Sequence, residues 1–215
     1  RTRPRRFASF GCASCGTTHD QPAGHDHAHD QDHAHAHDHA HAHGPDAING
    51  HLWLDPIRMK EFVEGVEPIL KQTYPDHAQA IDTNTDQLLK ELDQLSEDYS
   101  FMLSEVPKKE MVTFHNAFDL LAERYGLKVV AHLAEVEAHG PSITAGELRK
   151  VKQAIEQYDL KVIYREPQMP ETAAQAIEDQ AEVLLMVLDP LGKAGESYDQ
   201  LMRKNLEVLN TGQRK

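Results

Sequence analysis

The chain has 215 residues, of which 40% are hydrophobic, and its formal net charge is −13 at pH 7. This length suits one domain or two small ones, and the acidic balance argues against nucleic acid as a partner, because phosphate binding needs a basic face that the chain lacks beyond residue 6. No apolar run approaches the ~20 residues that span a bilayer, and the arginines of residues 1–6 are not followed by the apolar segment of a signal peptide.

Residues 1–24 show neither a helical nor a strand period. They hold four Arg, two Pro and three Gly, a composition that predicts disorder, and they are assigned to no domain. Cys12 and Cys15 form a single CxxC pair. A redox motif would need a strand before it and a helix after it, so an incidental pair is favoured over a structural disulfide or an accessory metal contact.

A histidine-rich stretch follows, in which nine histidines alternate with Ala and Asp. Neutral imidazole is the commonest metal ligand, and the aspartates add anionic oxygens. The stretch has no apolar face to bury, so residues 25–50 are predicted to be a disordered, solvated loop that captures ions such as zinc, rather than a purification tag or a low-complexity accident. The accessory capture residues are His25, His27, His29, His33, His35, His37, His39, His41 and His43.

Two helices are predicted next. Apolar residues recur at spacings of three and four after Asp55 and Pro56, which suit a helix cap and a first-turn proline, and Pro75 ends the pattern. A longer helix covers residues 76–106 with one apolar stripe. Its length predicts a rod between two lobes, with a two-helix hairpin broken near residues 83–85 as the alternative.

After residue 107 the pattern becomes that of an α/β domain. Short apolar runs alternate with helical patterns, which predicts βαβ units and a mostly parallel four-stranded sheet with flanking helices. Gly126 suits a helix C-terminus, Thr144 and Glu147 a capping box, and Pro170 a first helical position. The predicted strands cover residues 111–114, 127–132, 160–164 and 183–188, and the helices cover 116–125, 145–158, 171–181 and 198–209.

Metal-capable side chains follow each predicted strand. Ligands of open α/β sheets bind at the carboxyl ends of the strands, so His115, His132, Glu166 and Asp189 are candidates. His115, between β-prone residues and a helix start, is the strongest of them. Asp189 could instead form an Asx-type turn before the following proline, and His132 and Glu166 are weaker candidates.

His51 is a second strong candidate. It lies in the segment GHLWLDP, where Trp53 and Leu54 would bury one side of its ring and Asp55 would cap the next helix. His77 and His139 suit the surface.

Four motifs then carry a family resemblance: GHLWLDP at residues 50–56, TFHNAFDLLAERYGL at 113–127, YREPQMPETAAQAI at 164–177 and VLDPLG at 187–192. In this order, after a His/Asp-rich loop, they closely resemble the periplasmic zinc-binding protein of the bacterial zinc ABC importer, ZnuA-type, within a wider metal-receptor family that also serves manganese. The resemblance covers roughly residues 25–212. It places family ligands at His51 and His115, and manganese receptors add an Asp at the position of Asp189.

The resemblance implies two α/β lobes joined by a long rigid helix, with the metal in the cleft between them. This sequence departs from the family pattern in one respect. The family's first lobe carries another metal-binding histidine before the His-rich loop, and residues 1–24 are too short to be that lobe. Residues 51–75 are therefore expected to be the end of the N-terminal lobe, 76–106 the linking helix and 107–215 the C-terminal lobe. Either the chain is a fragment or the lobe is supplied otherwise, and His19 or the flexible histidines could substitute for the missing ligand.

The expected function is capture of zinc in the periplasm and its delivery to the membrane permease of an ABC importer, by a monomer without covalent chemistry. The predicted metal ligands are His51, His115 and Asp189. Alternatives are a manganese receptor of the same family, a His-rich zinc storage or chaperone protein that works through residues 25–43, and a hydrolytic metalloenzyme. The enzyme would need a general base, for which Glu166 is the only candidate, and the chain has no HExxH signature.

Overall fold

A computed structural model describes residues 49–137, 140–169, 177–178 and 182–215. The predictions for residues 1–48, including the CxxC pair and the histidine-rich loop, lie outside the described residues, as do those for His139 and Pro170 and most of the predicted helix at 171–181.

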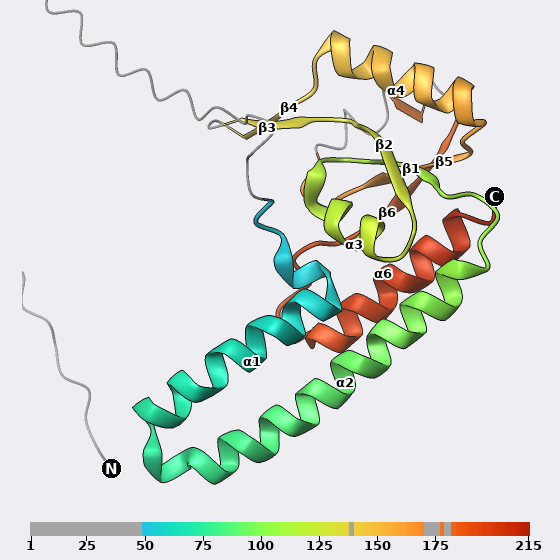
Figure 1. Cartoon of the computed structure of the whole chain (residues 1–215). Helices are drawn as coiled ribbons and strands as arrows, with labels where there is room; N and C mark the ends of the chain where they lie inside the picture. Colours follow the sequence, from blue (N-terminus) through green and yellow to red (C-terminus); the bar gives the residue numbers. More distant parts are fainter. Residues whose placement is uncertain (1–48, 138–139, 170–176, 179–181) are drawn as a thin grey trace, which may run out of the picture. The chain divides into compact units, whose positions relative to one another are not determined.

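The first two long helices form an antiparallel pair (Figure 1). Helix α1 (Pro56–Thr73) begins where the Asp55 side chain accepts the backbone N–H of Ile57, and it ends before Pro75, as predicted. After a 3-10 turn, η2 (Pro75–His77), helix α2 (Ala78–Ser104) continues for 27 residues without the alternative break near residues 83–85. Helix α2 packs against α1 along part of its length and against the last helix, α6 (Tyr198–Gly212), along another.

Each of the four predicted strands is present. Strand β1 (Glu110–Thr113) pairs in parallel with β2 (Lys128–His132), and β5 (Val162–Arg165) pairs in parallel with β6 (Leu184–Val187). The prediction of one four-stranded sheet is wrong in this detail, because the described strands form two separate parallel pairs, although β1 and β5 are in contact. Alternation along the sequence predicts the direction of short strands, but not whether neighbours lie close enough for ladder hydrogen bonds. A short antiparallel pair, β3 (Glu135–Glu137) and β4 (Gly140–Ser142), was not predicted.

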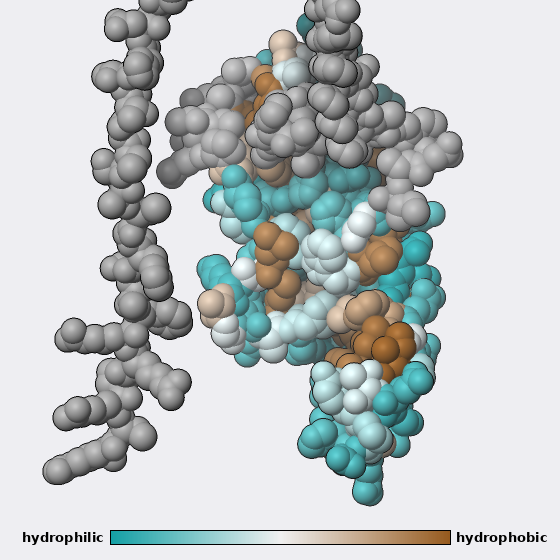
Figure 2. All heavy atoms as spheres, turned by 90° about the vertical axis from the view of Figure 1, so that its left-hand side faces the viewer, coloured by the Kyte–Doolittle hydropathy of each residue, from teal (hydrophilic) through white to brown (hydrophobic). Residues whose placement is uncertain are grey.

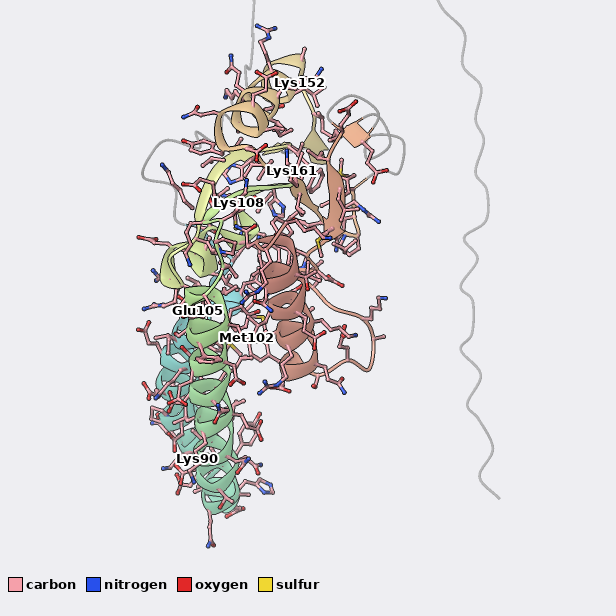
Figure 3. The ribbon with its side chains drawn as sticks, turned by 90° about the vertical axis from the view of Figure 1, so that its right-hand side faces the viewer. Lys90, Met102, Glu105, Lys108, Lys152 and Lys161 are labelled. Atoms are coloured by element: carbon pink, nitrogen blue, oxygen red, sulfur yellow. The ribbon has the colours of Figure 1, made fainter. Side chains whose placement is uncertain are left out.

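Local capping signals define the helices around the strands. Helix α3 (Asp119–Arg124) follows a 3-10 turn, η3 (Asn116–Phe118), and Gly126 after it has a left-handed φ of 72°. Helix α4 (Ala145–Tyr158) begins with the predicted capping box, in which Thr144 and Glu147 each bond to the other's backbone N–H. At its C-terminal end, Lys108 and Lys161, both labelled in Figure 3, form ion pairs with the exposed Asp159.

Strands β1 and β5 are largely buried on both faces. Met111 and Tyr164 point into a cluster formed with α2, α3 and α6, whereas their neighbours Val112 and Ile163 point into a second cluster formed with α4. Successive side chains of a strand alternate between faces, so this division shows helices covering both sides, as in α/β proteins. The packing therefore supports the predicted α/β class.

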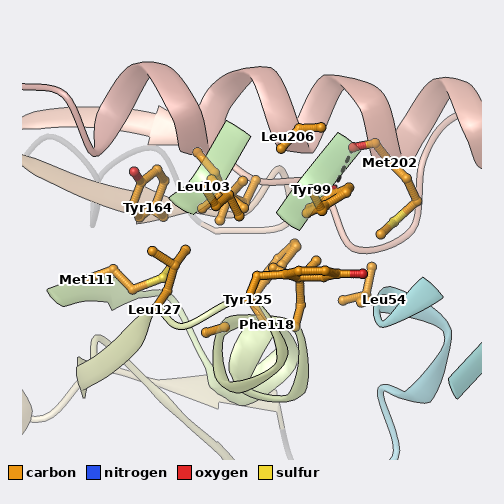
Figure 4. Close-up of a cluster of buried hydrophobic side chains, with 14 of the residues drawn as sticks. Leu54, Tyr99, Leu103, Met111, Phe118, Tyr125, Leu127, Tyr164, Met202 and Leu206 are labelled. Atoms are coloured by element: carbon orange, nitrogen blue, oxygen red, sulfur yellow. Dashed lines mark hydrogen bonds between the residues drawn. The ribbon is translucent and has the colours of Figure 1, made fainter. Parts of the chain in front are cut away.

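Tyr99 of α2 lies in the cluster that α2, α3 and α6 form with Met111 and Tyr164 (Figure 4). Its ring is fully buried, and its hydroxyl donates a 2.7 Å hydrogen bond to the carbonyl of Met202 in α6. In the unfolded chain this hydroxyl bonds to water, and burial without a partner would cost that hydrogen bond. The bond to Met202 replaces it, so Tyr99 both fills the core and fixes α6 against α2.

The surface of α1 is mixed. Figure 2 shows small, separate apolar areas among mostly hydrophilic side chains on the face it presents, and the exposed apolar side chains of α1 include Phe62 and Ile69. None of the described helices combines the length and the apolar character that a membrane crossing requires.

Candidate metal centre

Two histidines that are 64 positions apart in the sequence meet at one point. His51 lies just before the 3-10 turn η1 (Leu52–Leu54), and His115 lies between the end of β1 and η3. Their Nε2 atoms are 3.3 Å apart, and the two rings meet edge to face, with centroids 5.0 Å apart and an interplanar angle of 72°. The structure thus brings together the two residues that were the strongest ligand candidates.

Asn49 and Trp53 hold His51. The Asn49 side-chain oxygen lies 2.8 Å from His51 Nδ1 and also accepts the backbone N–H of His51, at 3.0 Å. The Trp53 ring lies against the imidazole, with ring centroids 5.3 Å apart. The Trp53 indole N–H donates to the carbonyl of Pro190, and the hydroxyl of Tyr198 donates to the carbonyl of Trp53, both at 2.8 Å, so the segment is tied to the start of α6.

A buried carboxylate holds His115. Glu166, which directly follows β5, is 3% exposed as a residue, and its Oε1 lies 2.5 Å from His115 Nδ1. The Thr113 hydroxyl donates to the carbonyl of His115, at 2.9 Å, which fixes the backbone at the strand end. Glu166 was a weak candidate ligand in the sequence, and it lies behind the imidazole as a partner of Nδ1.

The surroundings favour neutral imidazole at His51. Burial lowers the pKa of His51 below its usual 6.5, the proximity of His115 lowers it further, and the negative charge of Asp119 opposes both effects. Metal binding requires an unprotonated ring nitrogen, so this environment keeps a ligand available near neutral pH.

Asp189 lies in a turn. Its Oδ1 accepts the backbone N–H groups of Leu191 and Gly192, both at 3.0 Å, which is the Asx-type turn that was the alternative assignment. The side chain of Asn205 bonds to both the N–H and the carbonyl of Asp189. Within the described residues, no group of three or more His, Cys, Asp or Glu side chains is arranged to hold a metal ion, so Asp189 does not complete a three-ligand set with the two histidines here.

Among the described residues, the other candidates do not join this pair in a set of three metal ligands. His132 Nε2 lies 3.0 Å from Asp119 Oδ1, and both side chains are about a third exposed. His77 ends η2 and is exposed, as expected. Sequence reasoning missed Asn49, whose position two residues before His51 gives no signal of its own, because its role depends on the folded geometry.

Comparisons with known proteins place this fold in a class. The structure matches a mutant of the laminin-binding adhesin Lmb from Streptococcus agalactiae, with a TM-score of 0.71 and 27% identity over 80% of this chain and 65% of that one. It also matches the Zn(II)-bound ZnuA-like domain of Streptococcus pneumoniae AdcA, with a TM-score of 0.65 and 30% identity over 78% of this chain and 65% of that one. The class is that of proteins with the fold of the ZnuA-like domain of AdcA, which is Zn(II)-bound in its own structure.

The family follows from the sequence match. The family model described as zinc-uptake complex component A, periplasmic (ZnuA), matches residues 13–212, and the chain belongs to this family. It is a family of binding proteins rather than enzymes, as the sequence predicted.

Two curated relatives show the extent of the match. Zinc-binding protein AdcA of Streptococcus pyogenes (serotype M3) is 33% identical over 170 residues, which are 76% of this chain and 33% of that protein. High-affinity zinc uptake system protein ZnuA of Bacillus subtilis is 30% identical over 171 residues, which are 76% of this chain and 53% of that one. The chain thus spans a third to about half of the length of these relatives.

Proposed function

We propose that this chain binds zinc between His51 and His115 and delivers it, outside the cytoplasm, to the membrane permease of an ABC importer. The observation that carries the zinc assignment is the distance of 3.3 Å between the two Nε2 atoms. In a tetrahedral zinc site, two bonds of about 2.05 Å that enclose about 109° place their nitrogens ~3.3–3.4 Å apart. The pair therefore has the spacing of two ligands of one zinc ion.

The donor atoms favour zinc over manganese. Both are imidazole nitrogens, which suit zinc, whereas manganese suits sites rich in oxygen. Two relatives support the assignment, because they are named a zinc-binding protein and a zinc uptake protein. We carry the importer permease and the periplasmic location over from the family, whose model is described as periplasmic, and we expect the protein to act as a monomer.

Replacing both histidines tests the site directly. In calorimetric zinc titrations at pH 7.5, the variant His51→Ala/His115→Ala should lose the tightest binding phase while keeping weak binding of several ions by residues 25–43. His77→Ala is the matched control, since His77 is exposed and belongs to a turn between helices. An unchanged tight phase in the double variant would remove the assignment.

Asp189 was predicted from the sequence as a third ligand, and a substitution can separate that role from the turn in which it lies here. The variant Asp189→Asn keeps an Oδ1 that can accept the two turn N–H groups, and it removes the negative charge. A carboxylate ligand predicts a loss of zinc affinity of tenfold or more at unchanged thermal stability. Equal affinity in the two proteins would restrict Asp189 to the turn.

A metal-storage function is the second candidate, and it would reside wholly in residues 25–43. Nine histidines in 19 residues can hold several ions weakly, as a solvated multi-site chelator does. The two functions differ in where the tightest ion binds, and removal of these residues separates them.

A further inference from the structure

We infer that Glu166 and Asn49 are positioning residues that hold both imidazoles with the proton on Nδ1, so that the two Nε2 lone pairs converge before an ion arrives. The inference rests on the two hydrogen bonds at the Nδ1 atoms, from His51 to Asn49 and from His115 to Glu166. The spacing of the Nε2 atoms shows which function these bonds would serve. The inference rests on the proposed function for the identity of the ion, but the proton positions concern the zinc-free protein alone.

The orientation of the Asn49 amide is fixed without reference to the imidazole. One end faces the backbone N–H of His51 at 3.0 Å, which can only donate, so that end is the oxygen. The other end lies 2.8 Å from the carbonyl of Asn116, which can only accept, so that end is the nitrogen. The atom that lies 2.8 Å from His51 Nδ1 is the same oxygen, and Nδ1 must therefore be the donor.

The second imidazole is oriented by a charge. An ionised carboxylate can only accept, so Glu166 Oε1, 2.5 Å from His115 Nδ1, also requires the proton on Nδ1. Glu166 is 3% exposed as a residue, and water therefore competes little for this contact. Metal-bound histidines commonly donate their second ring N–H to a carboxylate or carbonyl, which sets the tautomer and the ring direction.

Both Nε2 atoms then carry lone pairs. A neutral imidazole has one N–H, and here it is committed to Nδ1 on each ring, so the contact of 3.3 Å between the Nε2 atoms joins two acceptors. Two acceptors do not attract each other, and their approach is instead that of two ligands directed at one cation. Asn49 also links the two histidine segments, because it bonds to His51 on one side and to the carbonyl beside His115 on the other.

Nitrogen-15 NMR of the zinc-free protein reads the tautomers directly. At about pH 8.5, above the ordinary imidazole pKa of about 6.5, wild type should show the Nδ1–H form at His51 and at His115, with signals assigned from the two single alanine variants. In Glu166→Leu, His115 should move toward the Nε2–H form while His51 stays unchanged. In Asn49→Ala, His51 should move toward the Nε2–H form while His115 stays unchanged. An Nε2–H form on either wild-type ring, or a His115 tautomer that Glu166→Leu leaves unchanged, would overturn the inference.

Zinc affinity gives a second readout. Loss of either partner should weaken binding about 10–100-fold, and Glu166→Gln, which keeps an acceptor oxygen, should recover part of the loss. Glu147→Gln is the matched control, because Glu147 is also buried but belongs to the capping box of α4, and it should change neither tautomer nor affinity. If Glu166→Leu does not fold, Asn49→Ala and Glu166→Gln decide the question in the same two measurements.

The results also separate the inference from the proposed function. Nδ1–H tautomers in a wild-type protein whose pair binds no zinc would refute the function and leave the positioning role intact. Tight zinc binding that survives loss of both partners, with unchanged tautomers, would refute the positioning role alone.

Discussion

The chemistry of His51 is set by what surrounds its ring. Asn49 occupies the Nδ1 side, Trp53 lies against the ring, and Nε2 faces His115. Burial and the second imidazole both disfavour a positive charge there, and both lower the pKa of His51. The ring is therefore a neutral nitrogen donor under conditions in which a solvated histidine is partly protonated.

This environment predicts how zinc binding depends on pH. A proton competes with zinc for Nε2, and because the pKa of His51 is lowered, this competition sets in at a lower pH than it would at an ordinary, solvated histidine. Affinity should therefore hold near pH 7.5 and be lower at pH 5.5, where protons compete more strongly for the imidazole nitrogens. Calorimetric titrations at the two values check this, and equal binding constants would contradict it.

At the scale of elements, α6 meets β5 closely. Gly212 at the end of α6 lies against Tyr164 of β5, and a Cβ added at Gly212 would come within 2.2 Å of the tyrosine oxygen. The Tyr164 hydroxyl is buried and donates a 2.7 Å hydrogen bond to the Gln213 side chain, so the ring has little freedom to move away. A small residue is therefore required where the helix crosses the strand.

The contact predicts opposite outcomes for two glycines in helices. Gly212→Ala should lower the free energy of unfolding by about 1–3 kcal/mol, because overpacking displaces a hydrogen-bonded ring. Gly65→Ala in α1, where an added Cβ meets nothing within 4 Å, should raise it by about 0.5–1 kcal/mol through helix propensity. Urea unfolding curves of both variants test the pair, and equal effects would show that the contact with Tyr164 is not limiting.

Local elements were predictable because their signals are local. The starts of two helices are marked by Asp55 with Pro56 and by Thr144 with Glu147. These caps form through hydrogen bonds between residues that are close in the sequence. The separation of the strands into two pairs was not predictable, since it depends on how closely β1 approaches β5, a strand that lies far from it in the sequence. The same reason hid Asn49 and the pairing of Glu166 with His115, whereas a position after a strand was enough to single out His115.

At the scale of the whole molecule, deletion of residues 25–43 separates a receptor from a storage protein. A receptor should keep one tight zinc ion, because His51 and His115 are held by Asn49, Glu166 and the segment around Trp53. A storage protein should lose nearly all of its bound metal. Metal content after dialysis measures the difference, with His51→Ala/His115→Ala in the full chain as the complementary control.

The hydrogen bonds that tie Trp53 to Pro190 and Tyr198 have a practical consequence. They immobilise the chain's only indole with its ring centre 5.3 Å from that of His51. Emission from an indole responds to charge nearby, and no second tryptophan contributes background. If the pair binds zinc as proposed, the protein would contain its own fluorescent indicator of the bound ion, and zinc loading and release could be followed in real time without a label.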